Sequence, residues 1–512
     1  MARQPNPAHR GLALAAVGLA TFMTSLDNTV VNVALPSIQR DLGLSLSGLE
    51  WIASAYVLAF AGLLLAGGRL ADLYGRRRLF LAGTALFTAA SLASGLASSP
   101  AVLLAGRVAQ GAGAALAAPT ALTIIAAMFP GERERGRAVG AWSGTSALAV
   151  ALGPLAGGFI SQHWHWSWIF FINVPLGALT LALGATAVTE SRGTRLPRGL
   201  DVPGLAAATL ALTALSYALI QGHAAGWTSP PILAALAAAA AASAAFAAAE
   251  ARSPAPMIDL ALFRNRVFAG GTATLVLWGF GVLGVYFFTP LYLQGVLGFS
   301  PTAAGLAFVP MALLMAASAT AAPLLAGRAG AGRAVAAGMV LVAAGLAAVA
   351  LLGQHASFAS LMAPLAAVGV GSGLTMPVTA AILGVIPPAQ AGVAGGILNA
   401  AREASGLLGV TVIGAILAAR QGRRSARAPH PMPRSCPGTP PAWAPPRPWC
   451  WPAARSPSAP CATQPATRCL HQLGTCTPGH APSAPRPRPD PPRAGPVSNP
   501  TPRKRTRAGE AT

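Results

Sequence analysis

Apolar runs of about 20 residues, separated by short polar segments, recur along the first 420 positions of the chain. A run of this length is what an α-helix needs to cross the hydrocarbon core of a bilayer. Thirteen runs predict thirteen spans, at 12–35, 51–71, 79–98, 101–128, 138–161, 168–188, 203–221, 231–250, 267–289, 302–326, 334–353, 358–382 and 396–419. The first run follows Arg3 and Arg10, but it is too long for the apolar core of a signal peptide. The predicted fold class is therefore an all-α polytopic membrane protein.

The composition excludes an ordinary soluble domain. Hydrophobic residues make up 54% of the chain and charged residues only 9%, with a mean hydropathy of +0.56. A soluble domain has about 25% charged residues, which it needs to cover its surface. All five Cys lie at position 436 or beyond, and no Gly-x-x-x-x-Gly-Lys phosphate loop occurs. The sequence therefore favours neither an enzyme nor an ATP-driven machine.

The distribution of Arg predicts the orientation in the membrane. With the N-terminus placed in the cytoplasm, seventeen Arg fall on the cytoplasmic side, and only Arg40 lies in an outer loop before the last span. Cytoplasmic loops are enriched in Lys and Arg, so this asymmetry predicts a cytoplasmic N-terminus. The outer loops carry Trp164, Trp166, Trp168 and Trp227, residues typical of membrane interfaces.

The chain changes character near residue 422. Residues 423–512 contain 23 of the 45 Pro, all five Cys, and fourteen basic residues against two acidic ones. This composition without periodicity predicts disorder. One interpretation is a basic tail that binds anionic lipid or nucleic acid. The other, which we favour, is a frameshift in a GC-rich gene, which would have removed a fourteenth span.

Asp27 lies in the middle of the first apolar run, and Arg107 lies in the fourth. A carboxylate at membrane depth is costly and usually serves ion or substrate handling. Counted along the two helices at about 1.5 Å per residue, both residues lie about 9–12 Å below the outer surface, so they can face each other. Two interpretations stay open: a structural ion pair, or a proton- or cation-binding acid whose charge state is tuned by Arg107.

Four short motifs accompany this pair. The cytoplasmic turn after the second span contains Gly68, Asp72, Gly75, Arg76 and Arg77. The fourth span reads Arg107-Val-Ala-Gln110-Gly111, and the first ends with the segment from Leu26 to Pro36. The fifth span carries a Gly/Pro pattern made of Gly140, Gly153, Pro154, Gly157 and Gly158.

In combination these motifs resemble the major facilitator superfamily, and more narrowly its fourteen-helix drug:proton antiporter branch. The turn after span two is similar to the superfamily's cytoplasmic-loop motif, and the fifth span to its antiporter motif. The resemblance covers residues 10–420. It implies a conformational-switch role for the turn and a gating role for the Gly/Pro helix.

The resemblance also implies an architecture of two six-helix bundles with two helices inserted between them. The expected division is 1–190 for the N-terminal bundle, 191–266 for the insertion, 267–421 for a C-terminal bundle with five recognised helices, and 422–512 for the tail. The implied function is proton-driven efflux of amphipathic drugs or antibiotics across the plasma membrane. It implies no cofactor or metal, lipid and small-molecule partners but no nucleic acid, and a monomer. A nutrient facilitator or importer and a non-functional truncated transporter are the alternatives.

Polar and aromatic residues within the spans are the candidates for the lining of a transport cavity. Arg402 and Glu403 are sequence neighbours, so we expect them to point to different faces, with Arg402 toward the cavity. The full set of candidates is Asn28, Asn32, Tyr56, Gln110, Trp142, Asn173, Gln294 and Arg402.

Overall fold

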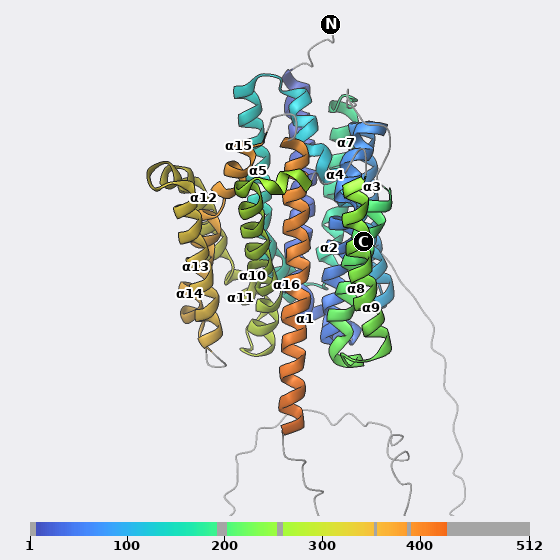
Figure 1. Cartoon of the computed structure of the whole chain (residues 1–512), viewed down its shortest axis with the longest axis vertical. Helices are drawn as coiled ribbons and strands as arrows, with labels where there is room; N and C mark the ends of the chain where they lie inside the picture. The colour runs from blue at the N-terminus through green and yellow to red at the C-terminus, as the bar shows by residue number, and fades with distance from the viewer. Residues whose placement is uncertain (1–6, 192–201, 253–259, 353–355, 387–390, 428–512) are drawn as a thin grey trace, which may run out of the picture. The chain divides into compact units, whose positions relative to one another are not determined.

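A computed structural model describes residues 7–191, 202–252, 260–352, 356–386 and 391–427. Within these ranges all regular structure is helical (Figure 1), which confirms the predicted fold class. The helices are α1 (Pro7–Leu42), α2 (Leu46–Tyr74), α3 (Arg76–Gly95), α4 (Pro100–Met128), α5 (Glu132–His163), α6 (Trp168–Phe171), α7 (Asn173–Ala187), α8 (Val202–Ala225), α9 (Pro230–Arg252), the 3-10 helix η1 (Leu260–Arg264), α10 (Arg266–Gly295), α11 (Pro301–Leu306), α12 (Val309–Ala329), α13 (Ala331–Leu352), α14 (Phe358–Leu374), α15 (Pro377–Gly384) and α16 (Ala391–Arg427).

Short polar side chains fix where several of these helices begin. The hydroxyl oxygens of Ser45, Ser99 and Ser300 each accept a hydrogen bond from a backbone N–H in the first turn of α2, α4 and α11. Such caps satisfy N–H groups that have no partner inside the helix. Pro100 and Pro301 then occupy the first helical positions, where a missing N–H costs nothing.

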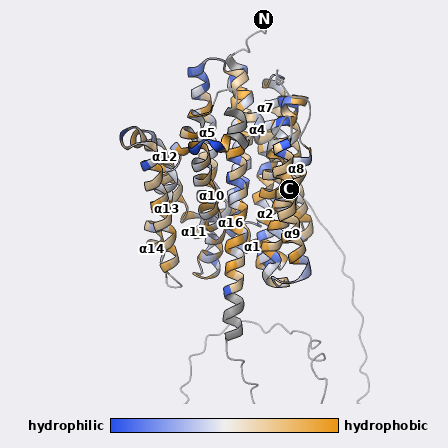
Figure 2. Cartoon of the chain, viewed as in Figure 1, coloured by the Kyte–Doolittle hydropathy of each residue, from blue (hydrophilic) through white to orange (hydrophobic). Residues whose placement is uncertain are grey.

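Twelve helices of the described part are long and apolar enough to cross a membrane. Figure 2 shows hydrophobic residues along most of the helices, whereas the charged first turns of α5 are blue. Helix α3 corresponds to the third predicted span, 79–98, but is not among the twelve. It opens with three Arg and carries several Ser and Thr, which lower its hydropathy.

Three of the predicted spans are interrupted rather than continuous. The runs at 168–188, 302–326 and 358–382 become the pairs α6–α7, α11–α12 and α14–α15. Pro175, Pro310 and Pro377 lie at or just after the three breaks. Proline has no N–H to donate and clashes with the preceding turn, so it opens the helix at that point.

The described residues form one compact unit. In its first part α4 packs between α2 and α3, and α1 packs on α5 and α7. In the later part α10 packs on α16, and α14 on α12 and α13. Helices α8 and α9 pack mainly on each other, while α8 also touches α2 and α16. The division at 190 and 266 stays a prediction.

The helices before residue 190 meet those after 266 at one end of the unit. We call the end of the unit where α1 finishes and α2 begins the outer end, because the Arg distribution predicts that it faces the outside. The contacts run between α5 and α11, α2 and α16, and α1 and α10. One buried cluster at this end combines Ile52 and Ile160 with Phe287 of α10 and Val410 of α16. At the opposite end, Phe80 and Ile125 belong to a separate cluster from Phe268 and Ile382. The unit is therefore closed at its outer end.

The predicted tail lies outside the described residues from position 428 onward. Helix α16 continues through Arg427 (Figure 1), beyond the expected end of the last span at 419, and the boundary at 421 stays a prediction.

Candidate functional site

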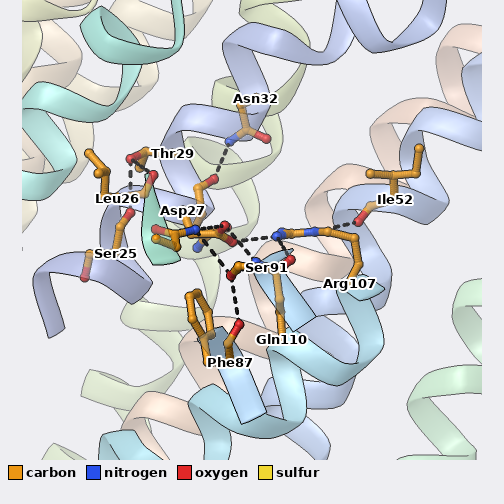
Figure 3. A network of polar contacts seen from close by, with 12 residues as sticks. Ser25, Leu26, Asp27, Thr29, Asn32, Ile52, Phe87, Ser91, Arg107 and Gln110 are labelled. Atoms are coloured by element: carbon orange, nitrogen blue, oxygen red, sulfur yellow. Dashed lines mark hydrogen bonds and ion pairs between the residues drawn. The ribbon is translucent and has the colours of Figure 1, made fainter. Parts of the chain in front are cut away.

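Asp27 of α1 and Arg107 of α4 meet in the interior of the first helical group, as expected from their depths. Arg107 Nη1 donates to Asp27 Oδ2 over 2.5 Å, and the Arg107 and Asp27 side chains are 1% and 0% exposed (Figure 3). A buried charge without a partner costs several kcal/mol, about 3–5 when one member of a pair is removed. The pair therefore holds α1 and α4 together in this conformation.

Amide and hydroxyl groups complete the hydrogen bonding around the carboxylate. Asp27 Oδ1 accepts from Gln110 Nε2 at 3.0 Å and from Asn173 Nδ2 at 2.9 Å. Gln110 Nε2 also donates to Ser91 Oγ at 2.7 Å. Helices α1, α3, α4 and α7 each supply one or more of these groups, so the site is built from four helices.

Arg107 has further partners besides Asp27. Its Nη1 donates to Gln110 Oε1 at 2.9 Å, and its Nε donates to the backbone oxygen of Ile52 at 3.3 Å. The guanidinium lies over the Tyr56 ring, 4.5 Å from the centroid, and 5.9 Å from that of Phe170. Ring faces attract a desolvated cation. The guanidinium is therefore held from several sides at once.

The glycines of α5 divide into a packed group and an open one. A Cβ on Gly153 would meet Thr29, one on Gly157 would lie 2.5 Å from Val30 O, and one on Gly158 would meet Pro301 O of α11. By contrast, nothing lies within 4 Å of a Cβ built on Gly140. Gly158 thus belongs to the closed outer contact with α11, Gly153 and Gly157 pack α5 on α1, and Gly140 lies apart from both.

The turn between α2 and α3 is tied to the end of α7. Asp72 Oδ1 accepts from Arg76 Nη2 at 2.9 Å, and Gly75 adopts φ 114°, a conformation that favours glycine. Glu190 Oε1 accepts from the backbone N–H of Arg77 at 3.2 Å, and the Arg77 side chain donates to Ala185 O. This geometry makes the turn a rigid corner in the present conformation. Gly68 packs loosely, 3.5 Å from Pro119.

Residues 17–410 match the Major Facilitator Superfamily. The chain belongs to this superfamily. Its members are transporters, which points to transport rather than catalysis for this chain. With twelve candidate spans, it is a multi-pass membrane protein with a lipid environment and a small-molecule substrate.

Similar curated proteins carry names of resistance and export. Multidrug resistance protein Stp of Mycobacterium tuberculosis is 39% identical over 409 residues, covering 80% of this chain and 76% of that protein. The tetracenomycin C resistance and export protein of Streptomyces glaucescens is 37% identical, with coverage of 80% and 76%. The methylenomycin A resistance protein of Streptomyces coelicolor is 36% identical, with coverage of 80% and 86%.

Solved structures of other transporters share the fold. A peptide transporter POT in complex with sulfate aligns with TM-score 0.59 at 16% identity, covering 80% of this chain and 94% of that chain. A bacterial homologue of the human lysosomal transporter Spinster aligns with TM-score 0.58 at 18% identity, covering 82% and 86%. At these identities the likeness concerns the fold alone.

Several cavity candidates of this superfamily member are not on an open surface. Tyr56, Gln110 and Asn173 are buried around the Asp27–Arg107 pair, so in this conformation they are parts of a sealed network. Asn28 and Asn32 are half-buried neighbours on α1, and Asn32 Nδ2 donates to Asn28 O at 3.3 Å. Trp142 and Gln294 are also half-buried, donating to Thr21 Oγ1 at 2.7 Å and to Val33 O at 2.9 Å.

The expected separation of Arg402 and Glu403 is wrong. Arg402 Nη2 donates to Glu403 Oε1 at 2.9 Å, with side-chain exposures of 42% and 11%. The long Arg side chain bends back across the helix surface to reach its neighbour. Arg402 is nevertheless the more exposed partner.

Two residues of the site and one of the turn escaped the sequence reasoning. Ser91 and Phe170 are 0% exposed and contact the network through Gln110 and Arg107, and Glu190 anchors the α2–α3 turn. A Ser or Phe in an apolar helix carries no distinguishing signal. Glu190 had such a signal: it is an acid directly after an apolar run, at the end of the chain's spans that the Arg distribution predicts to face the cytoplasm.

Proposed function

We propose that the chain exports amphipathic small molecules, such as drugs or antibiotics, in exchange for protons by alternating access. The names of the relatives support the class of cargo. The observation that carries the coupling is the sealed Asp27–Arg107 pair, a titratable acid placed in the interior of a membrane-embedded helix group.

The surroundings of the pair can accommodate both charge states of Asp27. If the carboxyl takes up a proton, its Oδ1 still accepts from Gln110 and Asn173. Arg107 then keeps Gln110 Oε1, Ile52 O and the Tyr56 ring as partners. A site with these alternative partners tolerates loss of the ion pair better than an isolated buried pair would. This tolerance is what a proton-coupling residue requires.

Because Asp27 is fully buried here, a proton reaches it only when the helices move. We assign that movement to the two motifs around the site. Gly158 and Pro154 meet α11 in the outer closure, and Gly153 and Gly157 hold α5 against α1 beside it. The turn with Gly68, Asp72, Gly75, Arg76 and Arg77 acts as the switch, pairing its charges in one conformer and releasing them in the other. Gly140 is assigned to the open part of α5, where it lets cargo approach the backbone.

The half-buried polar residues are assigned to the cargo path. Asn28, Asn32 and Arg402 fit this role, because they are neither sealed in the network nor fully exposed. An apolar path with few fixed polar groups suits loose recognition of amphipathic cargo. We further propose a monomer in the plasma membrane with a cytoplasmic N-terminus, no cofactor and no nucleic-acid partner.

The test is efflux of a fluorescent cationic dye from a susceptible bacterial host that expresses the full chain. We expect cells to accumulate less dye than the vector control, and an uncoupler that collapses the proton gradient to abolish the difference. Asp27→Asn should remove gradient-driven efflux, whereas Glu132→Gln, a change at an exposed acid of α5, should not. Full proton-driven efflux by Asp27→Asn would refute the assignment.

A further inference from the structure

A second buried acid lies away from the Asp27 network. Glu50, in the first turns of α2, is 3% exposed. Within the described part of the chain it has neither a hydrogen bond nor an ion pair. Its carboxylate lies directly against Gly414 of α16, where any Cβ would collide with Oε1. Glu50 therefore sits in the outer contact between α2 and α16.

The charged and titratable groups on the helices that pack on α2 are engaged elsewhere. Arg107 of α4 binds Asp27, and Arg402 and Glu403 of α16 bind each other. Tyr217 of α8 packs on Trp51, and Arg420 of α16 is exposed.

The charged groups of the remaining two neighbours, α1 and α3, are also accounted for. At the outer end of α1, Arg40 bonds Pro36 O and Ser37, and Asp41 bonds Trp166 and His165. The basic cluster of α3 lies at the opposite end of α2, with Asp72 and Glu190. None of these groups neutralises Glu50.

An isolated carboxylate in such a place is costly. Burying an ionised group without a partner costs far more than burying its neutral form, so the group takes up a proton instead. One helical turn further along α2, Ser54 Oγ is buried and has no partner among the described residues. A hydroxyl at i+4 lies on the same helix face as Glu50 and can accept from a protonated carboxyl. The site therefore suits the neutral acid.

We propose that Glu50 is a second proton-binding site, which is neutral while α2 and α16 are closed and ionises when they separate. Opening toward outer water releases one proton from the carboxyl to water, and closing takes one up; no other bond changes. Acid on the outer side thus favours closure. That the outer end faces the outside, and that the gate belongs to a proton-coupled cycle, rests on the function proposed above.

The first experiment measures the protonation state directly. Infrared spectra of the purified full chain in lipid nanodiscs, without cargo or gradient, report the C=O stretch of protonated carboxyls. We expect such a band at neutral pH, lost in Glu50→Gln and retained in Glu132→Gln. Survival of the full band in a folded Glu50→Gln protein would overturn the proposal. Should that variant fail to fold, Glu50→Asp serves instead: the band must shift, and an unshifted band overturns the proposal.

The second experiment measures gate opening by hydrogen–deuterium exchange at the outer ends of α2 and α16. One linked proton changes the opening equilibrium by up to about tenfold per pH unit. We expect protection to rise with acidity in the wild type and to be constant in Glu50→Gln. An equal pH dependence in both proteins would refute the gate. Neither readout needs transport. If efflux does not depend on the proton gradient but the Glu50 band is present, the proposed coupling is refuted while the Glu50 site stands.

Discussion

Gly158 of α5 lies against the backbone oxygen of Pro301 at the start of α11, with no room for a side chain between them. The contact is reciprocal, because Gly305 of α11 lies against the backbone oxygen of Pro154. Hydrogen bonds flank it: Thr302 N donates to Gln162 Oε1 at 3.0 Å, and Thr302 Oγ1 donates to Gly158 O at 3.4 Å. Two helices far apart in sequence thus close the outer end through backbone contact.

We expect Gly158→Ala to disfavour this closure. The added methyl group must displace α11, and overpacking of a tight contact costs about 1–3 kcal/mol, which corresponds to about a 5- to 150-fold shift in the closing equilibrium. Faster amide exchange in α11 and reduced dye efflux are the expected measurements. Gly144→Ala on the same helix is the control, because its methyl group meets no atom within 4 Å. Equal effects of the two changes would contradict the packing argument.

The sequence predicts the elements of this fold well, because long apolar runs in a bilayer have few alternatives to helix. It also predicts that Asp27 and Arg107 meet, since both depths follow from counting along two helices. Ser91 is different: it joins the site through the packing of α3 on α4 and α7, long-range contacts that its local sequence does not encode. The prediction that Arg402 and Glu403 point apart failed for a local reason. The direction of the two Cβ atoms does not limit where the end of a long Arg side chain can reach.

Variants of the buried pair can separate structure from coupling. Arg107→Gln alone leaves a buried carboxylate without its cation, and we expect a loss of about 3–5 kcal/mol in the free energy of unfolding. The double variant Asp27→Asn with Arg107→Gln removes both charges, so most of that stability should return. Thermal unfolding of the purified proteins measures the difference.

Efflux by the same double variant decides the role of the pair. If Asp27 carries protons, the restored protein should still lack gradient-driven efflux. If the pair only fixes helix packing, efflux should return together with the stability. The two interpretations therefore predict opposite outcomes in a protein of normal stability.

Glu190 and Gly75 offer a test of the α2–α3 corner. A Cβ on Gly75 would lie 2.6 Å from Glu190 Oε1, and φ 114° is itself strained for other residues. Gly75→Ala should therefore lower the free energy of unfolding by about 1–3 kcal/mol. Glu190→Ala should release the Arg77 N–H and speed its amide exchange, whereas Glu190→Gln retains an acceptor oxygen and should resemble the wild type. Unchanged exchange at Arg77 in Glu190→Ala would show that the corner does not depend on this carboxylate.

Glu50 and Gly414 form a complementary pair that a rescue experiment can test. In Gly414→Ala the new methyl group collides with the Glu50 carboxylate, so we expect the α2–α16 contact to open and its amides to exchange at least tenfold faster, equivalent to about 1.4 kcal/mol. Glu50→Ala removes the colliding atoms, because the carboxylate is replaced by a methyl group. The double variant should therefore regain slow exchange, since the two methyl groups fit where a carboxylate faced a glycine. Gly384→Ala is the control at a glycine with no atom within 4 Å of its Cβ position. If Glu50→Ala fails to rescue Gly414→Ala while both proteins remain folded, the carboxylate does not lie between the two helices in solution.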